Sequence, residues 1–435
     1  MKNLILFLSC FLSFSVFGQG WEQTYGGTDS DYGEAVQQTT DGGYIIAGGT
    51  SSFGNGSSDV YLIKTDGDGV EQWSQTYGGT EYEKGYSVQQ TTDGGYIIAG
   101  RSGPIDSSYV YLIKTDGDGL EQWSQTHGDG GSGYSMNYSV QQTTDEGYVM
   151  CCSTNPSDDD NDPHDVYLIK TDGDGLEQWS QTYGGTGHDS GSSVQQTTDG
   201  GYIIAGDTYS FGNGGSDVYL IKTDGDGVEQ WSQTYGGTEY EIGYSVQQTT
   251  DGGYIISGRT DSFGNGNLDF YLIKTDGNGL EQWSQTYGGT APDLGGISVQ
   301  QTTDGGYITT GATQSFGNGV FDVYLIKTDG NGLEQWSQTY GGMAPDRGRS
   351  VQQTSDGGYI ISAYTSSFGN GSGDVYLIKT DSEGTLSSSF IIPTPSNRKL
   401  DRVIDVLGRE VNHTTNQILF HIYDDGSVEK KFVVE

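Results

Sequence analysis

The sequence predicts an all-β fold: a seven-bladed β-propeller with four-stranded antiparallel blades, followed by a small C-terminal β domain. All seven tryptophans fall at one position of an internal repeat that recurs about every 52 residues. Each copy holds four short strand-like segments bounded by Gly/Asp turns, which is typical of one propeller blade. A parallel β-helix, the alternative, needs shorter rungs and a different period. The tryptophans are Trp21, Trp73, Trp123, Trp179, Trp231, Trp283 and Trp336.

The strands of one copy, named A to D, follow from β-branched and aromatic runs between turn residues. In the second copy we expect strands at Ser87–Thr91, Tyr96–Ala99, Val110–Lys114 and Glu121–Thr126. An Asp-Gly-Gly turn joins A to B, and an Asp-Gly-Asp-Gly turn joins C to D. No segment of the repeat shows a helical period.

The two ends of the repeat region predict how the ring closes. The first copy begins with a D strand, Trp21–Tyr25, and the last copy ends after a C strand, Asp374–Lys379. The N-terminal strand can therefore complete the last blade and remove its free edge. In the alternative, Thr385–Phe390 supplies the missing D strand.

Composition excludes some classes of partner. The formal net charge is −39, which argues against nucleic acid and anionic membranes as partners, because both attract basic proteins. Such a charge suits a saline exterior, where ions screen self-repulsion. Cys151 and Cys152 are adjacent within one strand-like segment, and the three cysteines form no disulfide framework or metal motif.

The N-terminus reads as a signal peptide over residues 1–18, with Lys2, an apolar run and small residues before a cleavage site at Gln19. No other segment has the length of a transmembrane helix. The propeller is expected over residues 19–381, and the protein is expected outside the cytoplasm, as a monomer.

The C-terminal residues leave the repeat pattern. A linker is expected over residues 382–397, and a terminal domain over 398–435 with strands at Val403–Val406, Ile418–Tyr423 and Lys431–Val434. Through Val406-Leu407-Gly408-Arg409-Glu410 and Ile422-Tyr423-Asp424-Asp425-Gly426, this tail resembles the type A C-terminal sorting domain of the type IX secretion system of Bacteroidota. The resemblance implies export across the outer membrane by that machinery, then surface attachment or release.

The repeat itself resembles two groups of propellers. The run Thr-Asp-Gly-Asp-Gly-x-Glu-Gln-Trp is similar to the tryptophan-docking motif of quinoprotein-type propellers, and the order of Gly, Tyr and Trp resembles kelch repeats. Both resemblances support the fold and imply little about activity.

Catalytic motifs are missing from the sequence. No Ser-His-Asp order, HExxH, P-loop or dinucleotide fingerprint is present, and no histidine recurs in the repeat. A pair of carboxylates could serve glycoside hydrolysis, but with 58 acidic residues some pair is always present, so this signal identifies no site. We therefore predict no catalytic residues, and an enzymatic function stays an open alternative.

The candidate binding surface is the face of the ring that carries the B–C and D–A loops. These loops vary among the copies, whereas the A–B and C–D turns on the other face are nearly constant. Binding residues concentrate on loops held by a rigid scaffold. Neutral drift in exposed loops is the alternative explanation.

Six copies carry an acid ten residues after the tryptophan, and the sequence leaves a carboxylate ring at the channel mouth that binds Ca²⁺ open as one role for them. In the alternative, each acid caps its local turn. No other cofactor is expected. The six are Asp31, Glu83, Asp189, Glu241, Asp293 and Asp346.

Aromatic side chains of the variable loops are candidates for stacking on sugars, whereas those at fixed repeat positions are expected to pack between blades. The loop candidates are Tyr82, Tyr134, Tyr240, Phe53, Phe211, Phe263, Phe316 and Phe368.

These features predict a secreted or cell-surface binding or adhesion protein that engages polysaccharide or protein through the variable face. One alternative is a glycoside hydrolase or lyase with acids at the channel mouth. A second alternative is a purely structural surface repeat. An active site would break the repeat symmetry with singular polar residues that converge in space.

Overall fold

The computed structural model describes residues 20–104, 109–128, 138–154, 163–386, 400–405, 409, 417–423 and 428–433. The predicted signal peptide, Tyr134 and most of the tail motifs lie outside these residues. The chain divides into two compact units, Met1–Leu386 and Ser387–Glu435. In the described part of the chain, no helix is long and apolar enough to span a membrane.

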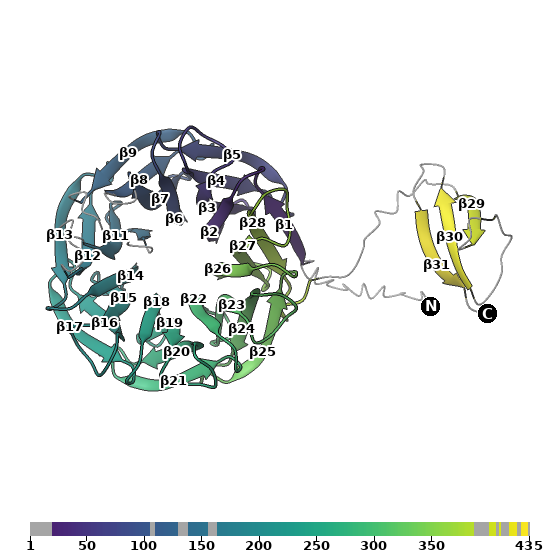
Figure 1. The fold of residues 1–435 in the computed structure, drawn as a ribbon. Helices are drawn as coiled ribbons and strands as arrows, with labels where there is room; N and C mark the ends of the chain where they lie inside the picture. The colour runs from purple at the N-terminus through teal and green to yellow at the C-terminus, as the bar shows by residue number, and fades with distance from the viewer. Residues whose placement is uncertain are drawn as a thin grey trace, which may run out of the picture. The chain divides into compact units, whose positions relative to one another are not determined.

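The first unit is a ring of seven sheets around a central channel, each with four antiparallel strands (Figure 1). This confirms the predicted seven-bladed propeller. Blade 1 comprises β2 (Asp31–Gln38), β3 (Tyr44–Thr50), β4 (Asp59–Thr65) and β5 (Glu71–Tyr77). Blade 2 comprises β6 (Glu83–Gln90), β7 (Tyr96–Ser102), β8 (Tyr109–Thr115) and β9 (Glu121–His127). Blade 3 comprises β10 (Ser139–Gln142), β11 (Tyr148–Ser153), β12 (Val166–Thr171) and β13 (Glu177–Tyr183).

The remaining blades repeat this order. Blade 4 comprises β14 (Asp189–Gln196), β15 (Tyr202–Thr208), β16 (Asp217–Thr223) and β17 (Glu229–Tyr235). Blade 5 comprises β18 (Glu241–Gln248), β19 (Tyr254–Thr260), β20 (Asp269–Thr275) and β21 (Glu281–Tyr287). Blade 6 comprises β22 (Asp293–Gln301), β23 (Tyr307–Thr313), β24 (Asp322–Thr328) and β25 (Glu334–Tyr340). Blade 7 comprises β26 (Asp346–Gln353), β27 (Tyr359–Thr365), β28 (Asp374–Thr380) and β1 (Trp21–Tyr25).

The seventh blade joins the two ends of the propeller. Strand β1 pairs antiparallel with β28, with Trp21 opposite Lys379 and Tyr25 opposite Val375. The outer strand of this blade therefore comes from the start of the chain, as Figure 1 shows. The pairing covers an edge that would otherwise expose unpaired backbone groups.

Each hydrophobic core lies between two neighbouring blades. The two middle strands of a blade are buried on both faces, so they carry continuous apolar runs such as those of β3 and β4. One core, for example, joins Tyr44 and Ile46 of blade 1 to Val375 and Leu377 of blade 7. Cys151 and Cys152 are packing residues of this kind. Both are buried and free of disulfide bonds, and their side chains enter the two cores on either side of blade 3.

A Trp–Gly–Tyr contact locks one blade to the next at six of the seven junctions. At the junction of blades 3 and 4, the Tyr183 hydroxyl donates a 2.6 Å hydrogen bond to the carbonyl of Gly227. Gly227 has a φ of 77°, and a Cβ at that position would lie 2.6 Å from the Trp179 ring. The same indole packs on Tyr202 with ring centroids 5.8 Å apart. The tryptophans are therefore packing residues of the blade junctions.

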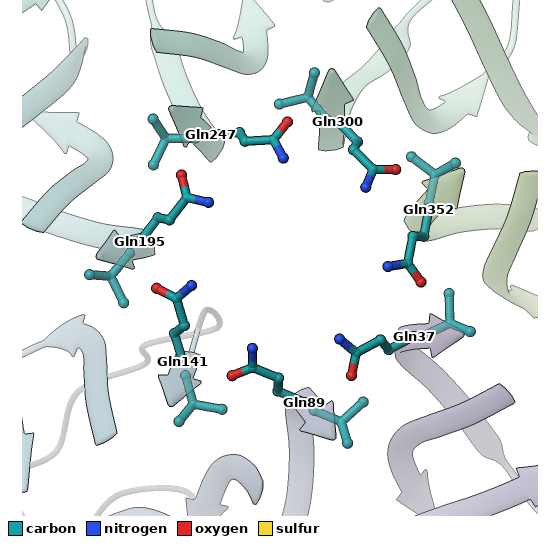
Figure 2. A pocket seen from close by; sticks show the side chains of 14 residues that line it. Gln37, Gln89, Gln141, Gln195, Gln247, Gln300 and Gln352 are labelled. Atoms are coloured by element: carbon teal, nitrogen blue, oxygen red, sulfur yellow. The ribbon is translucent and has the colours of Figure 1, made fainter. Parts of the chain in front are cut away.

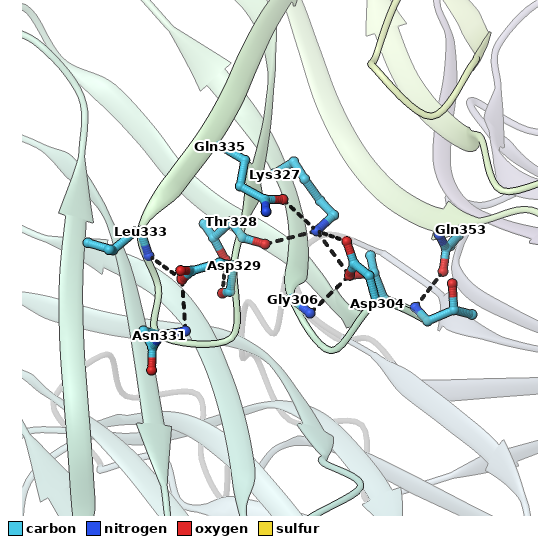
Figure 3. A network of polar contacts seen from close by, with 11 residues as sticks. Asp304, Gly306, Lys327, Thr328, Asp329, Asn331, Leu333, Gln335 and Gln353 are labelled. Carbon is cyan, nitrogen blue, oxygen red and sulfur yellow. Dashed lines mark hydrogen bonds and ion pairs between the residues drawn. The ribbon is translucent and has the colours of Figure 1, made fainter.

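The constant turns of the opposite face are held by a buried lysine, as Figure 3 shows for blade 6. Lys327 is 3% exposed, and its Nζ donates to the Asp304 carboxylate at 2.9 Å, to the Thr328 carbonyl at 2.9 Å and to Gln335 Oε1 at 3.1 Å. Burial acts to raise the pKa of Asp304, but hydrogen bonds from Lys327 and the turn outweigh it and lower that pKa to about 2. The constancy of these turns therefore has a structural cause.

The second unit contains a three-stranded antiparallel sheet formed by β29 (Leu400–Asp405), β30 (Gln417–Tyr423) and β31 (Val428–Val433). Three strands were predicted here, and β29 and β31 each begin about three residues earlier than expected. A secretion role for this unit stays a prediction.

Removing β1 should open the ring. A chain that starts at residue 27 lacks the outer strand of blade 7 and two aromatic side chains of its core, so it should lose at least about 3 kcal/mol of unfolding free energy. Its uncovered β28 edge should promote association. Urea unfolding and light scattering measure both effects against a chain that starts at residue 20. Equal stability of the two chains would contradict this closure.

The blade lock should not tolerate a side chain at its glycine. Gly227→Ala forces an unfavourable φ and a clash with Trp179, so it should cost about 1–2 kcal/mol from backbone strain alone. Gly200→Ala is the matched control, because Gly200 has a similar φ of 86° and a Cβ there meets nothing within 4 Å. Chemical unfolding of both variants measures the difference, and equal effects would argue against a lock at this glycine.

Candidate functional site

A cavity of 790 Å³ occupies the channel where the D–A loops lead into the innermost strands. Its walls come from the first half of the A strands and from the far ends of the B strands. The variable B–C and D–A loops meet at this face, since the Asp31 N–H bonds to the Gly373 carbonyl and the Glu83 N–H to the Ser58 carbonyl. The cavity therefore opens toward the predicted binding face.

Within this wall the repeat symmetry is broken at defined positions. The fourth residue of strand A differs among the copies, in the order Glu34, Tyr86, Tyr138, Ser192, Tyr244, Ile297 (shifted by one inserted residue) and Arg349. The sixth residue of strand B differs as well, in the order Gly49, Arg101, Ser153, Asp207, Arg259, Ala312 and Tyr364. The neighbouring Val-Gln-Gln and Tyr-Ile segments stay nearly constant.

Basic side chains converge on the cavity. Apart from the lysine that recurs in every copy, the propeller contains five basic residues: Lys84, Arg101, Arg259, Arg347 and Arg349. Four of them line the cavity, and Arg347 lies two residues from Arg349 on β26. Local positive charge thus gathers at one site of a strongly acidic chain.

Glu34 organises two of these cations. Its carboxylate lies 2.6 Å from Lys84 Nζ and 3.4 Å from Arg349 Nε. Burial acts to raise the pKa of Glu34, but Arg349 and Lys84 outweigh it and lower that pKa to about 2. Glu34 is therefore ionised at neutral pH, and it holds both cations at the cavity wall.

Asp207 and Arg259 face the opposite part of the wall. Burial raises the pKa of Asp207 to about 7, although Arg259 acts to lower it and Asp189 adds to the rise. The Nε atoms of Arg101 and Arg259 are buried and make no hydrogen bond with the described residues. These guanidinium groups keep unused donors within the wall.

Aromatic rings alternate with the cations. The Arg101 guanidinium lies 4.9 Å from the Tyr82 ring centroid, and Lys84 Nζ lies 4.4 Å from that of Tyr32. Tyr86 and Tyr138 pack with their centroids 5.4 Å apart. The wall therefore offers both flat apolar faces and charge.

Farther along the channel, seven glutamines form a ring (Figure 2). The side-chain oxygen of each accepts a hydrogen bond from the backbone of the next blade, as Gln37 Oε1 does from the Gln90 N–H at 2.6 Å. Figure 2 shows the amide nitrogens turned toward the centre of the channel. The ring presents donors to the lumen and comprises Gln37, Gln89, Gln141, Gln195, Gln247, Gln300 and Gln352.

The six predicted acids lie elsewhere than expected. Each begins strand A as its first residue, about four positions earlier than the strand was predicted to start, and each is at most 3% exposed. Glu241, for example, accepts bonds from the Gly237 N–H at 2.7 Å, the Thr260 hydroxyl at 2.7 Å and the Ser262 N–H at 3.0 Å. The D–A turn encloses these acids, so they form no open ring, and each accepts a backbone N–H of that turn, which agrees with the turn-capping alternative; the six are Asp31, Glu83, Asp189, Glu241, Asp293 and Asp346.

Calcium at these acids stays a prediction with little geometric support. In the ranges that the structure describes, no three His, Cys, Asp or Glu side chains group closely enough to hold a metal ion. In the Asp-Gly-Asp-Gly turn of blade 1, the Asp66 carboxylate accepts the N–H groups of Asp68 and Val70, so it caps its own turn.

The predicted loop aromatics divide into two groups. The phenylalanines are 42–45% exposed and pack on C-strand tyrosines, as Phe211 does on Tyr219 at 5.6 Å. They form a repeated feature and do not line the cavity: Phe53, Phe211, Phe263, Phe316 and Phe368. Tyr82 lines the cavity, whereas Tyr240 is 46% exposed and packs on Tyr209.

No family model matches the chain, and no curated protein matches it significantly. Solved structures with a similar fold include a variant of an α-L-arabinofuranosidase from Fusarium graminearum with an iminosugar inhibitor, at 11% identity and a TM-score of 0.50 over 84% of this chain and 98% of that one. A protein of unknown function from Dyadobacter fermentans matches at 12% identity and a TM-score of 0.45, covering 83% and 98%. The Pan2 WD40 domain of Neurospora crassa matches at 10% and 0.47, covering 80% and 89%. These likenesses show the fold alone.

The cavity cations were not among the residues predicted from the sequence. Their signal is nevertheless present there, because Lys84, Arg101, Arg259, Arg347 and Arg349 are the basic residues of the propeller that do not recur in the repeat. Finding it requires aligning the copies within strands A and B as well as in the loops.

The raised pKa of Asp207 predicts a pH-dependent stability. An acid whose folded pKa is raised above its unfolded value stabilises the fold below the unfolded pKa, near 4, and that contribution is lost as the pH rises through about 7. Between pH 5 and pH 8, the unfolding free energy of Asp207→Asn should therefore fall by about 2–3 kcal/mol less than that of the wild type.

Urea unfolding at both pH values measures this difference. Asp68→Asn is the control, because Asp68 is exposed and two other copies already carry asparagine there, at Asn278 and Asn331. An equal pH slope in the wild type and in Asp207→Asn would show that Asp207 ionises normally.

Proposed function

We propose that this chain is an exported binding protein that takes part of a polysaccharide into the cavity at the channel mouth. The observation that carries this proposal is the break in repeat symmetry. Seven near-identical copies differ at those strand positions whose side chains converge on one cavity. Drift alone would also scatter such differences over the strands and turns of the opposite face, which stay nearly constant.

The chemistry of the cavity supports a glycan ligand. A volume of 790 Å³ lies within the usual range for small-molecule sites and suits a short stretch of sugar units. Tyrosine faces such as those of Tyr82, Tyr86 and Tyr244 offer stacking surfaces for sugar rings, and charged and hydroxyl groups between them offer hydrogen bonds. The rigid ring orders these groups before the ligand arrives, which reduces the entropic cost of binding.

The proposed location follows from the sequence ends. An N-terminal signal peptide and a tail resembling a type IX sorting domain together support export to the cell surface or the medium. The net charge of −39 agrees with a saline exterior.

A hydrolase is the second candidate, and one observation favours it. The cavity holds two carboxyl groups with opposite pKa shifts, since that of Asp207 rises to about 7 and that of Glu34 falls to about 2. Such divergence is typical of acid and base pairs. The ion pairs of Glu34 with Lys84 and Arg349 count against a free nucleophile or base.

Binding of the full-length chain to a polysaccharide array, with end-product analysis, tests the proposal. Tyr244→Ser should lower affinity at least about tenfold by removing a stacking face. It should still fold, because blade 4 has Ser192 at the same position. Phe263→Ser is the control, because Phe263 is an exposed aromatic outside the cavity.

The outcomes separate the candidates. Binding without cleavage that is lost in Tyr244→Ser supports the proposal. Cleavage that is lost in Asp207→Asn supports the hydrolase. No binding to any glycan would contradict the proposal and favour a protein ligand or a purely structural repeat.

A further inference from the structure

We propose that the cavity selects anionic glycans, that is, chains whose sugars carry carboxylate or sulfate groups. This inference rests on the proposed function and adds the chemical class of the ligand. Its basis is the placement of the non-repeated basic side chains Lys84, Arg101, Arg259 and Arg349 in one wall.

The first step of the argument is charge. Against these four cations the cavity lining contains two acids, Glu34 and Asp207. Glu34 is shared between Lys84 and Arg349, and Asp207 makes no ion pair within 4 Å of Arg259 among the described residues. The wall therefore carries a net positive charge, which an anionic ligand would neutralise. The rest of the propeller carries a net negative charge, so the cavity wall differs from it in sign.

The second step is unused hydrogen-bonding capacity. Arg101 is only 6% exposed, yet its Nε has no acceptor among the described residues, and its Nη2 makes a long 3.4 Å contact with the Pro104 carbonyl. Arg259 Nε also lacks an acceptor. A buried donor without a partner is costly, and an acceptor oxygen from a ligand removes that cost.

The glutamine ring extends this bias along the channel. Its amide oxygens are used by the backbone of neighbouring blades, so the groups left for the lumen are N–H donors. A ligand rich in acceptor oxygens satisfies such a surface, and a cation does not.

The aromatic side chains favour an acidic sugar chain over an acidic peptide. Tyr82 lies against Arg101, and Tyr32 and Tyr86 both lie against Lys84. This interleaving provides a flat face beside Lys84 and Arg101, which matches a sugar ring that carries its charge on a short substituent.

The test compares four probes on the full-length chain by titration calorimetry: polygalacturonate, dextran sulfate, neutral dextran and poly-glutamate. Arg101→Ser and Arg259→Ser are the variants, because blade 3 carries Ser153 at the same strand position. Lys431→Gln is the charge-matched control, since it removes one cation from the C-terminal unit. Thermal unfolding confirms that each variant is folded.

We expect binding to polygalacturonate or dextran sulfate and none to neutral dextran or poly-glutamate. Each arginine variant should weaken binding by roughly tenfold or more, and the control should not. Comparing polygalacturonate with dextran sulfate distinguishes recognition of carboxylate from recognition of sulfate.

The inference is overturned if neutral dextran binds as well as the anionic chains, or if the arginine variants bind like the wild type. Preferential binding of poly-glutamate would also overturn it in favour of an acidic peptide. Neutral binding that is still lost in Tyr244→Ser would leave the proposed function standing without its anionic selectivity.

Discussion

The contact on which the propeller depends is the Trp–Gly–Tyr lock between adjacent blades. It joins the outer strand of one blade to the C–D turn of the next through an indole on a bare glycine Cα and a buried hydroxyl bond, as at Trp179, Gly227 and Tyr183. The junction of blades 2 and 3 departs from this pattern, because His127 of β9 replaces the tyrosine there. Since every junction needs the same geometry, the residues that make it cannot vary independently among copies.

This requirement decides where variation is allowed. The C–D turn, the D strand and the lysine-clamped A–B turn are all used by the scaffold, so they are nearly identical in every blade. The scaffold does not use the side chains at the second and fourth positions of strand A or at the sixth position of strand B. Because strand A is innermost in all seven blades, differences at these positions meet in the channel. A symmetric ring thus acquires one asymmetric site at its centre.

The same distinction explains what could be predicted. Tryptophan spacing and turn chemistry are local signals, and they correctly indicated the seven-bladed fold. The start of strand A, where acids such as Glu241 lie, was predicted too late. A bulge between Gly243 and Ser245 interrupts the alternation of inward and outward side chains there. Cavity residues such as Arg259 were missed because their neighbours lie one or more repeats away in sequence, and only ring closure brings them together.

An acidic protein can hold a cationic site because its charges act over different distances. At physiological ionic strength the screening length is about 8 Å, so exposed carboxylates on the opposite face contribute little at the cavity. Many of these are already neutralised locally, as Asp304 is by Lys327. Within the cavity wall, burial weakens screening, and Glu34 bridges Lys84 and Arg349, so this group of three keeps a net positive charge. A ligand that enters the channel therefore contacts these fixed cations directly, whereas one outside it meets the acidic surface.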